Sequence, residues 1–270
     1  MTLGRILASL SELSPARALQ YLREPWRISM TLAGSVLPDE PALRALFPDV
    51  DPARVDALHR EFIGHHQLFA DLDRSMVEMR GRRARLDGWK EFLYMAVRIA
   101  SPRLMVETGV FDGESSAVIL QALAEADAGE LISIDLPAVE AIAGSTHCMR
   151  ETSLPPGAPP GWIIPARLRS RHRLELGDSR SLLPRVLKEH PVIDVFFHDS
   201  LHTLEHQTYE YSTAWPHLRP GGLLLSDDVL WSAAFHRFCR SRRTPYVRVG
   251  GGVFGAARKA PHGAREGTGA

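Results

Sequence analysis

The chain has 270 residues, of which 44% are hydrophobic and 24% charged, and its 32 basic and 32 acidic side chains give a formal net charge of zero. This length and composition are typical of a globular protein with a substantial core. The balanced charge provides no global attraction to nucleic acid or to an anionic membrane, so we expect neither as a partner.

Targeting and crosslinking signals are sparse. The two cysteines, Cys148 and Cys239, stand far apart and form no CxxC pair, so we expect neither a disulfide framework nor a zinc site. No apolar run approaches the length of a membrane-spanning helix. The apolar run near Met1 is too short for a secretory signal peptide, which favours a cytoplasmic protein.

The first part of the chain shows helical periodicity and no strand signal. Ser14-Pro15 and Asp51-Pro52 each look like a helix cap followed by proline at the first helical position. We interpret residues 1–88 as a helical extension that covers an acceptor pocket or contacts a second copy of the chain. Apolar residues recur at helical spacing over 5–10, 15–22, 41–47, 53–69 and, more strongly, 89–99.

Beyond this extension, strands alternate with helices, which predicts an α/β domain over residues 89–260. Such alternation implies parallel strands joined by right-handed crossovers, as in a Rossmann-like sheet. A proline-rich segment at 155–165 interrupts the pattern, and we expect 261–270 to be a flexible tail. Strands are predicted at 104–108, 131–135, 174–176, 193–198 and 222–226, helices at 115–126, 181–189 and 203–215, and a closing hairpin at 246–249 and 253–257.

An acid lies within two residues of the end of each predicted parallel strand: Glu107, Asp135, Asp178, Asp199 and Asp227. In an open parallel sheet, ligands bind beyond the carboxyl ends of the strands. Each acid taken alone is more simply a helix cap, because Asp is a preferred capping residue. Their recurrence along one edge favours a polar ligand site over capping alone.

The turn after the first strand, Gly109-Val-Phe-Asp-Gly113, has GxxxG spacing and lacks the GxGxxG of a dinucleotide site. Glycines let the backbone come close to a ligand. Because Glu107 and Asp112 make this turn acidic, it suits a cationic, phosphate-free ligand such as S-adenosylmethionine better than a pyrophosphate.

Two further acids have both a ligand and a capping interpretation. Asp135 lies about 20 residues after the glycine turn, where an acid can accept hydrogen bonds from ribose hydroxyls, or it caps the next segment. Asp178 can accept a hydrogen bond from an adenine amino group or cap the following helix, and the two interpretations are equally supported.

The segment after the fourth strand carries a metal and base pattern. Asp199, Asp227 and Asp228 come from neighbouring strand ends and can surround a hard divalent cation such as Mg²⁺, although each is also a plausible loop cap. Mg²⁺ lowers the pKa of a bound hydroxyl, and His202 is a candidate general base, with a helix-capping or structural histidine as the alternative. By strand alternation His198 faces away from Asp199 and is expected to be structural. His206, one helical turn beyond His202, is expected to face solvent rather than to line the pocket.

The apolar patch at 162–164 has two interpretations of equal weight. It forms a lid or wall for an apolar substrate, or it is an apolar loop packed on the sheet.

Taken together, these motifs resemble those of class I S-adenosylmethionine-dependent methyltransferases. More narrowly, the chain resembles the metal-dependent macrolide sugar O-methyltransferases, which are distantly related to catechol O-methyltransferase. The resemblance covers about residues 90–258 and implies a Rossmann-like, seven-stranded class I methyltransferase sheet with an N-terminal helical extension. The insertion at 155–165 and the N-terminal helices have no counterpart in this resemblance, so the acceptor is not carried over. The resemblance rests on five motifs: Glu107-Thr-Gly-Val-Phe-Asp-Gly113, Ile134-Asp135, Gly177-Asp178-Ser179, Asp199-Ser-Leu-His202 and Asp227-Asp228.

By position, the resemblance implies roles for these residues. The methionine part of the cofactor would lie between Glu107 and Gly109, the ribose at Asp135, and the adenine near Asp178 and Ser179. Further cofactor contacts are implied for the same turn at Phe111, Gly113 and Ser115. Asp199, Asp227 and Asp228 would bind Mg²⁺, with Asp199 and His202 as the catalytic pair.

The predicted function is therefore Mg²⁺-dependent O-methylation of a hydroxyl on a small molecule, such as a sugar or a secondary metabolite. A metal-independent methyltransferase with His202 as the base is the first alternative. A nicotinamide-dependent oxidoreductase is disfavoured by the missing GxGxxG and by Glu107. A non-catalytic binding protein is the last alternative, and the intact acid and histidine set argues against it.

Overall fold

The computed structural model describes residues 39–86, 88–137 and 153–261. The helices predicted at 5–10 and 15–22, and nearly all of the tail predicted at 261–270, lie outside these residues. Among the described residues, no helix is long and apolar enough to cross a membrane.

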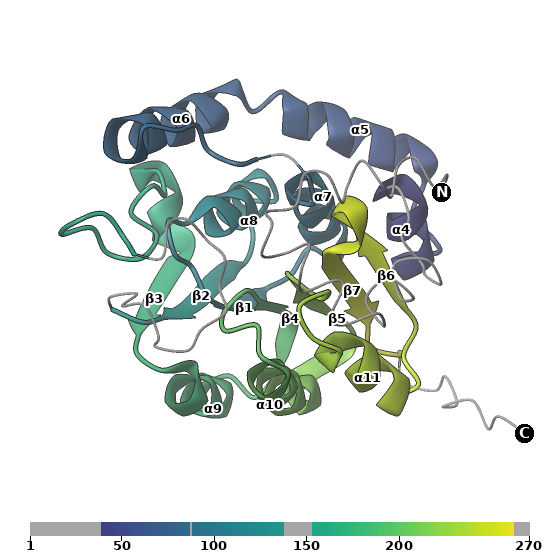
Figure 1. The fold of residues 1–270 in the computed structure, drawn as a ribbon. Helices are drawn as coiled ribbons and strands as arrows, with labels where there is room; N and C mark the ends of the chain where they lie inside the picture. The colour runs from purple at the N-terminus through teal and green to yellow at the C-terminus, as the bar shows by residue number, and fades with distance from the viewer. Residues whose placement is uncertain (1–38, 87, 138–152, 262–270) are drawn as a thin grey trace, which may run out of the picture.

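A seven-stranded sheet forms the centre of the molecule (Figure 1). Strand β7 runs antiparallel to β5 and β6, and the other neighbouring strands are parallel. This confirms the predicted Rossmann-like sheet and its closing hairpin. Side by side, the strands are β3 (His172–Leu176), β2 (Glu130–Asp135), β1 (Leu104–Thr108), β4 (Ile193–His198), β5 (Leu218–Ser226), β7 (Phe254–Arg258) and β6 (Tyr246–Val249).

Helices cover both faces of the sheet, which explains why consecutive residues of the central strands β1 and β4 are buried. On one face lie α9 (Ser179–Glu189), α10 (Leu204–Ala214) and α11 (Ala234–Ser241). On the other face lie α7 (Lys90–Ala100) and α8 (Glu114–Glu125) (Figure 1). Neighbouring residues of a strand therefore enter different cores: Phe196 packs on the α9–α11 side and Phe197 on the α7–α8 side.

The N-terminal extension forms an outer layer over α7 and α8. It consists of α4 (Asp39–Leu46), α5 (Pro52–Ile63) and α6 (His66–Arg80), of which α5 and α6 lie along the top of the view in Figure 1. Asp51 caps α5 by accepting a hydrogen bond from the backbone N–H of Ala53 at 2.9 Å, as the sequence predicted.

The single helix predicted over 53–69 was wrong in its extent, because two helices occupy this region. The chain leaves helical geometry at His65, whose ψ is 50°, and α6 then continues to Arg80. Gly81 ends α6 in the left-handed conformation that glycine adopts most easily.

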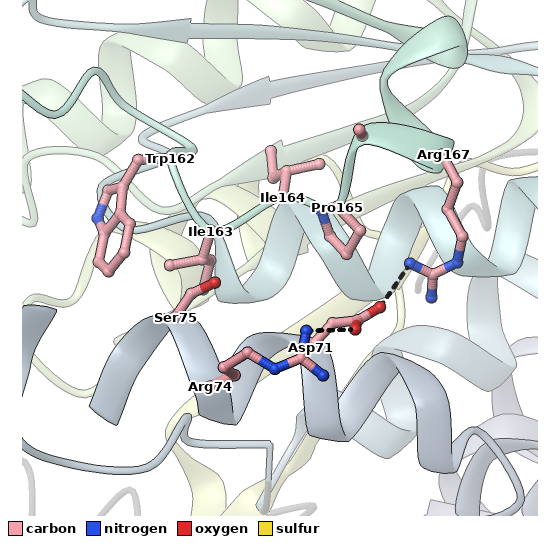
Figure 2. Close-up of a pocket in the computed structure, with 9 residues that line it drawn as sticks. Asp71, Arg74, Ser75, Trp162, Ile163, Ile164, Pro165 and Arg167 are labelled. Carbon is pink, nitrogen blue, oxygen red and sulfur yellow. Dashed lines mark hydrogen bonds and ion pairs between the residues drawn. The ribbon is translucent and has the colours of Figure 1, made fainter. Parts of the chain in front are cut away.

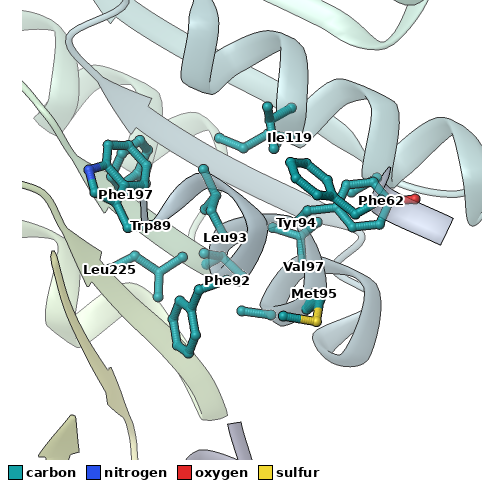
Figure 3. Packing of buried hydrophobic residues seen from close by; sticks show 14 of the residues in the cluster. Phe62, Trp89, Phe92, Leu93, Tyr94, Met95, Val97, Ile119, Phe197 and Leu225 are labelled. Carbon is teal, nitrogen blue, oxygen red and sulfur yellow. The ribbon is translucent and has the colours of Figure 1, made fainter. Parts of the chain in front are cut away.

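The extension and the sheet share one hydrophobic core. Leu58 of α5 and Leu72 of α6 are fully buried in the same cluster as Phe92 of α7 and Phe197 of β4. Figure 3 shows the centre of this cluster, where the ring of Trp89 packs edge-on against Phe197 with 5.8 Å between centroids. Fully burying one such side chain contributes roughly 1.5–3 kcal/mol, so the extension is part of what holds the sheet together.

Candidate active site

The acids predicted at the strand ends lie along one edge of the sheet. The register pairs Thr108 of β1 with His198 of β4, and His198 with Ser226 of β5. Asp199 and Asp227 directly follow these paired residues, so they emerge side by side. On the other side of β1, Asp135 ends β2 next to β3. The expectation that parallel strands bring these acids together is confirmed in its geometry.

The glycine turn after β1 packs tightly against the end of β4. Gly109 has a φ of +84°, and a Cβ added there would lie 2.0 Å from the backbone oxygen of Asp199. Only glycine fits at this position, because a side chain would collide with a backbone atom that cannot easily move.

Asp135 holds the same turn from the β2 side. One carboxylate oxygen accepts hydrogen bonds from the backbone N–H groups of Val110 at 2.9 Å and Phe111 at 2.7 Å. The other oxygen accepts from Leu136 at 2.7 Å. Burial raises the pKa of Asp135, although these three donors oppose the shift. The side chain thus shapes the turn, which the sequence alone did not indicate.

Glu107 is fully buried beneath the turn. Its oxygens accept hydrogen bonds from the hydroxyls of Ser116 at 2.6 Å, Ser133 at 2.7 Å and Ser115 at 3.3 Å. Burial raises the pKa of Glu107 to about 7, because the three hydroxyls compensate only part of the lost hydration. In this arrangement Glu107 ties β1, β2 and the start of α8 together.

Asp112, expected to add negative charge to the turn, is instead neutralised by the extension. Arg80, at the end of α6, donates a hydrogen bond to its carboxylate at 2.6 Å, and both side chains are buried. The indole N–H of Trp162 donates to the same oxygen at 2.8 Å. The sequence interpretation missed this pair because the second half of α6 was not predicted.

The proline-rich insertion packs onto the glycine turn. Ile163 and Ile164 are buried, and the N–H of Gly161 donates to the backbone oxygen of Phe111 at 2.8 Å. A Cβ on Gly113 would lie 2.8 Å from the Cα of Gly161. Of the two interpretations of the 162–164 patch, the arrangement fits the packed loop.

A cavity of about 400 Å³ opens between this insertion and α6. Figure 2 shows Asp71 in it, with dashed lines to Arg74 on its own helix and to Arg167 across the cavity, where the ion pair measures 3.1 Å. None of the acids at the strand ends lines this cavity. The strand-end acids thus form a site separate from this cavity.

His202 lies between two of the predicted metal ligands. Its Nε2 is 3.7 Å from Oδ1 of Asp199, and its Nδ1 is 3.6 Å from Oδ2 of Asp228. The ring is buried, with 9% of the residue exposed, while both carboxylates are partly open. Burial and the charges of Asp227 and Asp228 raise the pKa of Asp199 well above its usual range. The site is thus a crowded group of acids around one imidazole.

The predicted metal ligands do not converge as a finished metal cluster. Across residues 39–86, 88–137 and 153–261, no group of three or more His, Cys, Asp or Glu side chains is placed to hold an ion. In this placement Asp199 and Asp228 flank the histidine from opposite ring nitrogens.

At the end of β3, Asp178 is the N-cap of α9, because its carboxylate accepts the backbone N–H of Arg180 at 2.9 Å. This is the capping interpretation of Asp178. The neighbouring Ser179 is buried, and its hydroxyl lies 3.1 Å from Nε2 of His206.

The prediction that His206 faces solvent was wrong, because it is buried against Glu210 of α10. His198 has the structural place that the sequence predicted, since its side chain is fully buried and also bonds Glu210. Glu210 itself was missed. The signal present in the sequence was the spacing of four between His206 and Glu210, which places both on one helix face.

The stretch that carries these strand ends is similar to known proteins. Residues 106–229 match a family model described as a methyltransferase domain, and this stretch runs from β1 past Asp228. Over this stretch the chain is a methyltransferase domain, as the resemblance of its motifs implied. None of the curated proteins matches the chain.

Solved structures share the fold of this methyltransferase domain. The O-methyltransferase TomG from Streptomyces achromogenes, involved in tomaymycin synthesis and solved in complex with S-adenosylmethionine, is 16% identical, with a TM-score of 0.50. The similarity covers 72% of this chain and 90% of TomG. A methyltransferase from Geobacter sulfurreducens is 21% identical over 71% of this chain and 90% of that protein, with a TM-score of 0.48.

Proposed function

We propose that this methyltransferase domain transfers the methyl group of S-adenosylmethionine to a hydroxyl of a small molecule, with the help of Mg²⁺. The observation that carries the proposal is His202, a buried imidazole held between Asp199 and Asp228 at the edge where the cofactor is expected. Support for an oxygen acceptor comes from TomG, an O-methyltransferase of the same fold.

The cofactor is proposed to lie across the ends of β1, β2 and β3. In that pose the sulfonium and amino groups of its methionine part approach the turn that Glu107 supports. The ribose hydroxyls approach Asp135, whose oxygens already accept backbone donors and have further lone pairs to offer. The proposed contact residues are Glu107, Gly109, Phe111, Gly113, Ser115, Asp135, Asp178 and Ser179.

Asp199, Asp227 and Asp228 are the residues proposed to hold Mg²⁺. Their chemistry fits the ion, because carboxylate oxygens and water are its preferred ligands. Their electrostatics fit as well: burial and the charges of Asp227 and Asp228 raise the pKa of Asp199, and a divalent cation would relieve the repulsion among the three acids. When bound, Mg²⁺ would lower the pKa of the acceptor hydroxyl and orient it.

The proton and the methyl group then move in opposite directions. His202 accepts the proton of the acceptor hydroxyl, and Asp199 or Asp228 stabilises the resulting imidazolium. The acceptor oxygen forms a bond to the methyl carbon while the carbon–sulfur bond breaks. The electron pair of that bond stays on sulfur, which gives neutral S-adenosylhomocysteine. The domain contributes mainly alignment for this in-line displacement.

A second candidate is methyl transfer without metal. It is favoured by the placement of Asp199 and Asp228 on opposite nitrogens of His202, which suits an acid-supported base as well as a metal site. In this version His202 alone activates the hydroxyl.

Two measurements test the proposal in turn. Calorimetric titration with S-adenosylhomocysteine should show binding, and no heat would contradict the cofactor assignment. A screen of hydroxylated acceptors with S-adenosylmethionine and Mg²⁺, followed by S-adenosylhomocysteine release, tests the reaction.

Chelation separates the two versions. With an acceptor in hand, EDTA should abolish turnover and added Mg²⁺ should restore it. Asp227→Asn should raise the Mg²⁺ concentration that gives half-maximal activity at least tenfold. Asp71→Asn, in the cavity beside α6, is the matched control and should not change it. Full activity after exhaustive chelation would favour the metal-independent version.

A further inference from the structure

A fully buried carboxylate lies directly beneath the candidate active site. Glu210 of α10 has no exposed surface, and its two oxygens receive four hydrogen bonds. Its Oε2 accepts a hydrogen bond from the hydroxyl of Thr108 at 2.5 Å and pairs with Nδ1 of His198 at 2.6 Å. Oε1 accepts from the hydroxyl of Ser200 at 3.0 Å and pairs with Nε2 of His206 at 2.8 Å.

This set of donors keeps Glu210 ionised inside the protein. Burial alone would raise the pKa of the carboxyl group, but His198, His206 and their hydrogen bonds hold it well below its usual range. A carboxylate in the interior is costly unless every lone pair is satisfied, and an apolar side chain of similar size would pack there at less cost. The position of the charge therefore calls for an explanation beyond packing.

The partners of Glu210 supply that explanation, because they surround Asp199 in the chain. His198 comes directly before Asp199 and Ser200 directly after it, and one carboxylate binds both. The ring of His198 also meets the ring of His202 edge-on, with 5.3 Å between centroids and an angle of 83°. The loop that presents Asp199 and His202 is thus fastened from below on both sides of Asp199.

We infer that Glu210 is a positioning residue, which fixes Asp199 and His202 in the geometry needed for methyl transfer through its bonds to His198 and Ser200. This inference rests on the function proposed above. Glu210 contacts neither acceptor nor cofactor. It acts by removing conformational freedom from the loop, and misplacing a reacting group by a small distance is enough to cost a large factor in rate.

The test replaces Glu210 with glutamine, which keeps the shape and removes the charge. A glutamine has one acceptor oxygen and turns an NH2 group toward a pocket lined by donors, so the loop loses part of its anchorage. We expect Glu210→Gln to lower kcat at least tenfold, with the KM for S-adenosylmethionine and the Kd for S-adenosylhomocysteine unchanged within about twofold. A general loss of folding would instead lower the fraction of chains that bind S-adenosylhomocysteine, which the stoichiometry of the calorimetric titration reports.

Hydrogen–deuterium exchange gives a readout that needs no acceptor. Amides of residues 199–203 should exchange faster in Glu210→Gln than in the parent chain. Glu205→Gln is the matched control, because it makes the same chemical change on the same helix at an exposed position paired with Arg180. We expect it to alter neither kcat nor the exchange of 199–203.

Ser200→Ala removes a single donor and keeps the test decisive if Glu210→Gln does not fold. It should speed exchange in 199–203 and lower kcat in the same direction by a smaller factor. Unchanged exchange in both variants would overturn the inference, whatever the activity. An acceptor screen without any turnover by the parent chain would instead contradict the proposed function, and exchange would still decide the role of Glu210.

Discussion

At the scale of single residues, Glu107 is the acid whose burial has the clearest consequence. Its pKa is raised to about 7 in the folded chain, against 4.5 for an exposed glutamate. The folded state therefore binds a proton that the unfolded state has already released between these two values. The contribution of Glu107 to the unfolding free energy is therefore largest below pH 4.5 and falls as the pH rises toward 7. The ionisation of Glu107 in the folded chain lowers the unfolding free energy by roughly 3 kcal/mol, at about 1.4 kcal/mol per pH unit.

Glu107→Gln should remove this pH dependence. We expect the unfolding free energy of the variant, relative to the parent chain, to rise by roughly 3 kcal/mol between pH 4.5 and pH 8. Urea unfolding at several pH values measures the difference. A constant difference across this range would mean that Glu107 titrates like an exposed acid.

Gly109 is the residue at which the turn and β4 come closest. Gly109→Ala should combine left-handed backbone strain with a clash against Asp199, and lower the unfolding free energy by more than about 3 kcal/mol. Gly251 is the matched control, because it has a φ of +71° but nothing within 4 Å of an added Cβ. Gly251→Ala should cost only about 1–2 kcal/mol. Equal losses in urea unfolding would show that the contact with Asp199 is unimportant.

At the scale of elements, α6 is joined to the glycine turn by the Arg80–Asp112 pair. Arg80→Met would leave the buried Asp112 with only the longer ion pair to Arg82, at 3.6 Å, and should cost up to the roughly 3–5 kcal/mol that is typical of a broken buried pair. Adding Asp112→Asn should recover a large part of the loss, because the buried charge is gone and Trp162 keeps an acceptor. A double-mutant cycle in urea measures the coupling. Strictly additive losses would contradict a direct interaction.

The same elements show what sequence patterns can and cannot supply. The acids at the strand ends were predictable, because parallel strands necessarily present their carboxyl ends at one edge. The second half of α6 was missed although Leu68, Leu72 and Met76 recur at helical spacing, since charged residues surround them. The bond between Thr108 and Glu210 joins residues 102 positions apart, and no local pattern reports such a pairing.

At the scale of the whole molecule, the boundary that the sequence suggested at residue 88 crosses a continuous core. Side chains of the extension and of the sheet belong to one hydrophobic cluster. Periodicity identifies which face of a helix is apolar, but not which surface that face will cover. The helical extension could therefore be predicted, while its packing over α7 and α8 had to come from the fold.

Because of this packing, we expect the methyltransferase domain to depend on the extension for its folding. Leu43, Leu58, Leu68, Leu72 and Met76 are all at most 1% exposed. At roughly 1.5–3 kcal/mol each, their burial is comparable to the whole net stability of about 5–15 kcal/mol typical of a domain. A chain that begins at residue 88 would also expose the outer faces of α7 and α8 to water. We expect it to lose cooperative unfolding and near-ultraviolet circular dichroism and to bind the dye ANS, unlike the full chain. A truncated chain that unfolds cooperatively with the near-ultraviolet spectrum of the full protein would instead show that the methyltransferase domain folds without its extension.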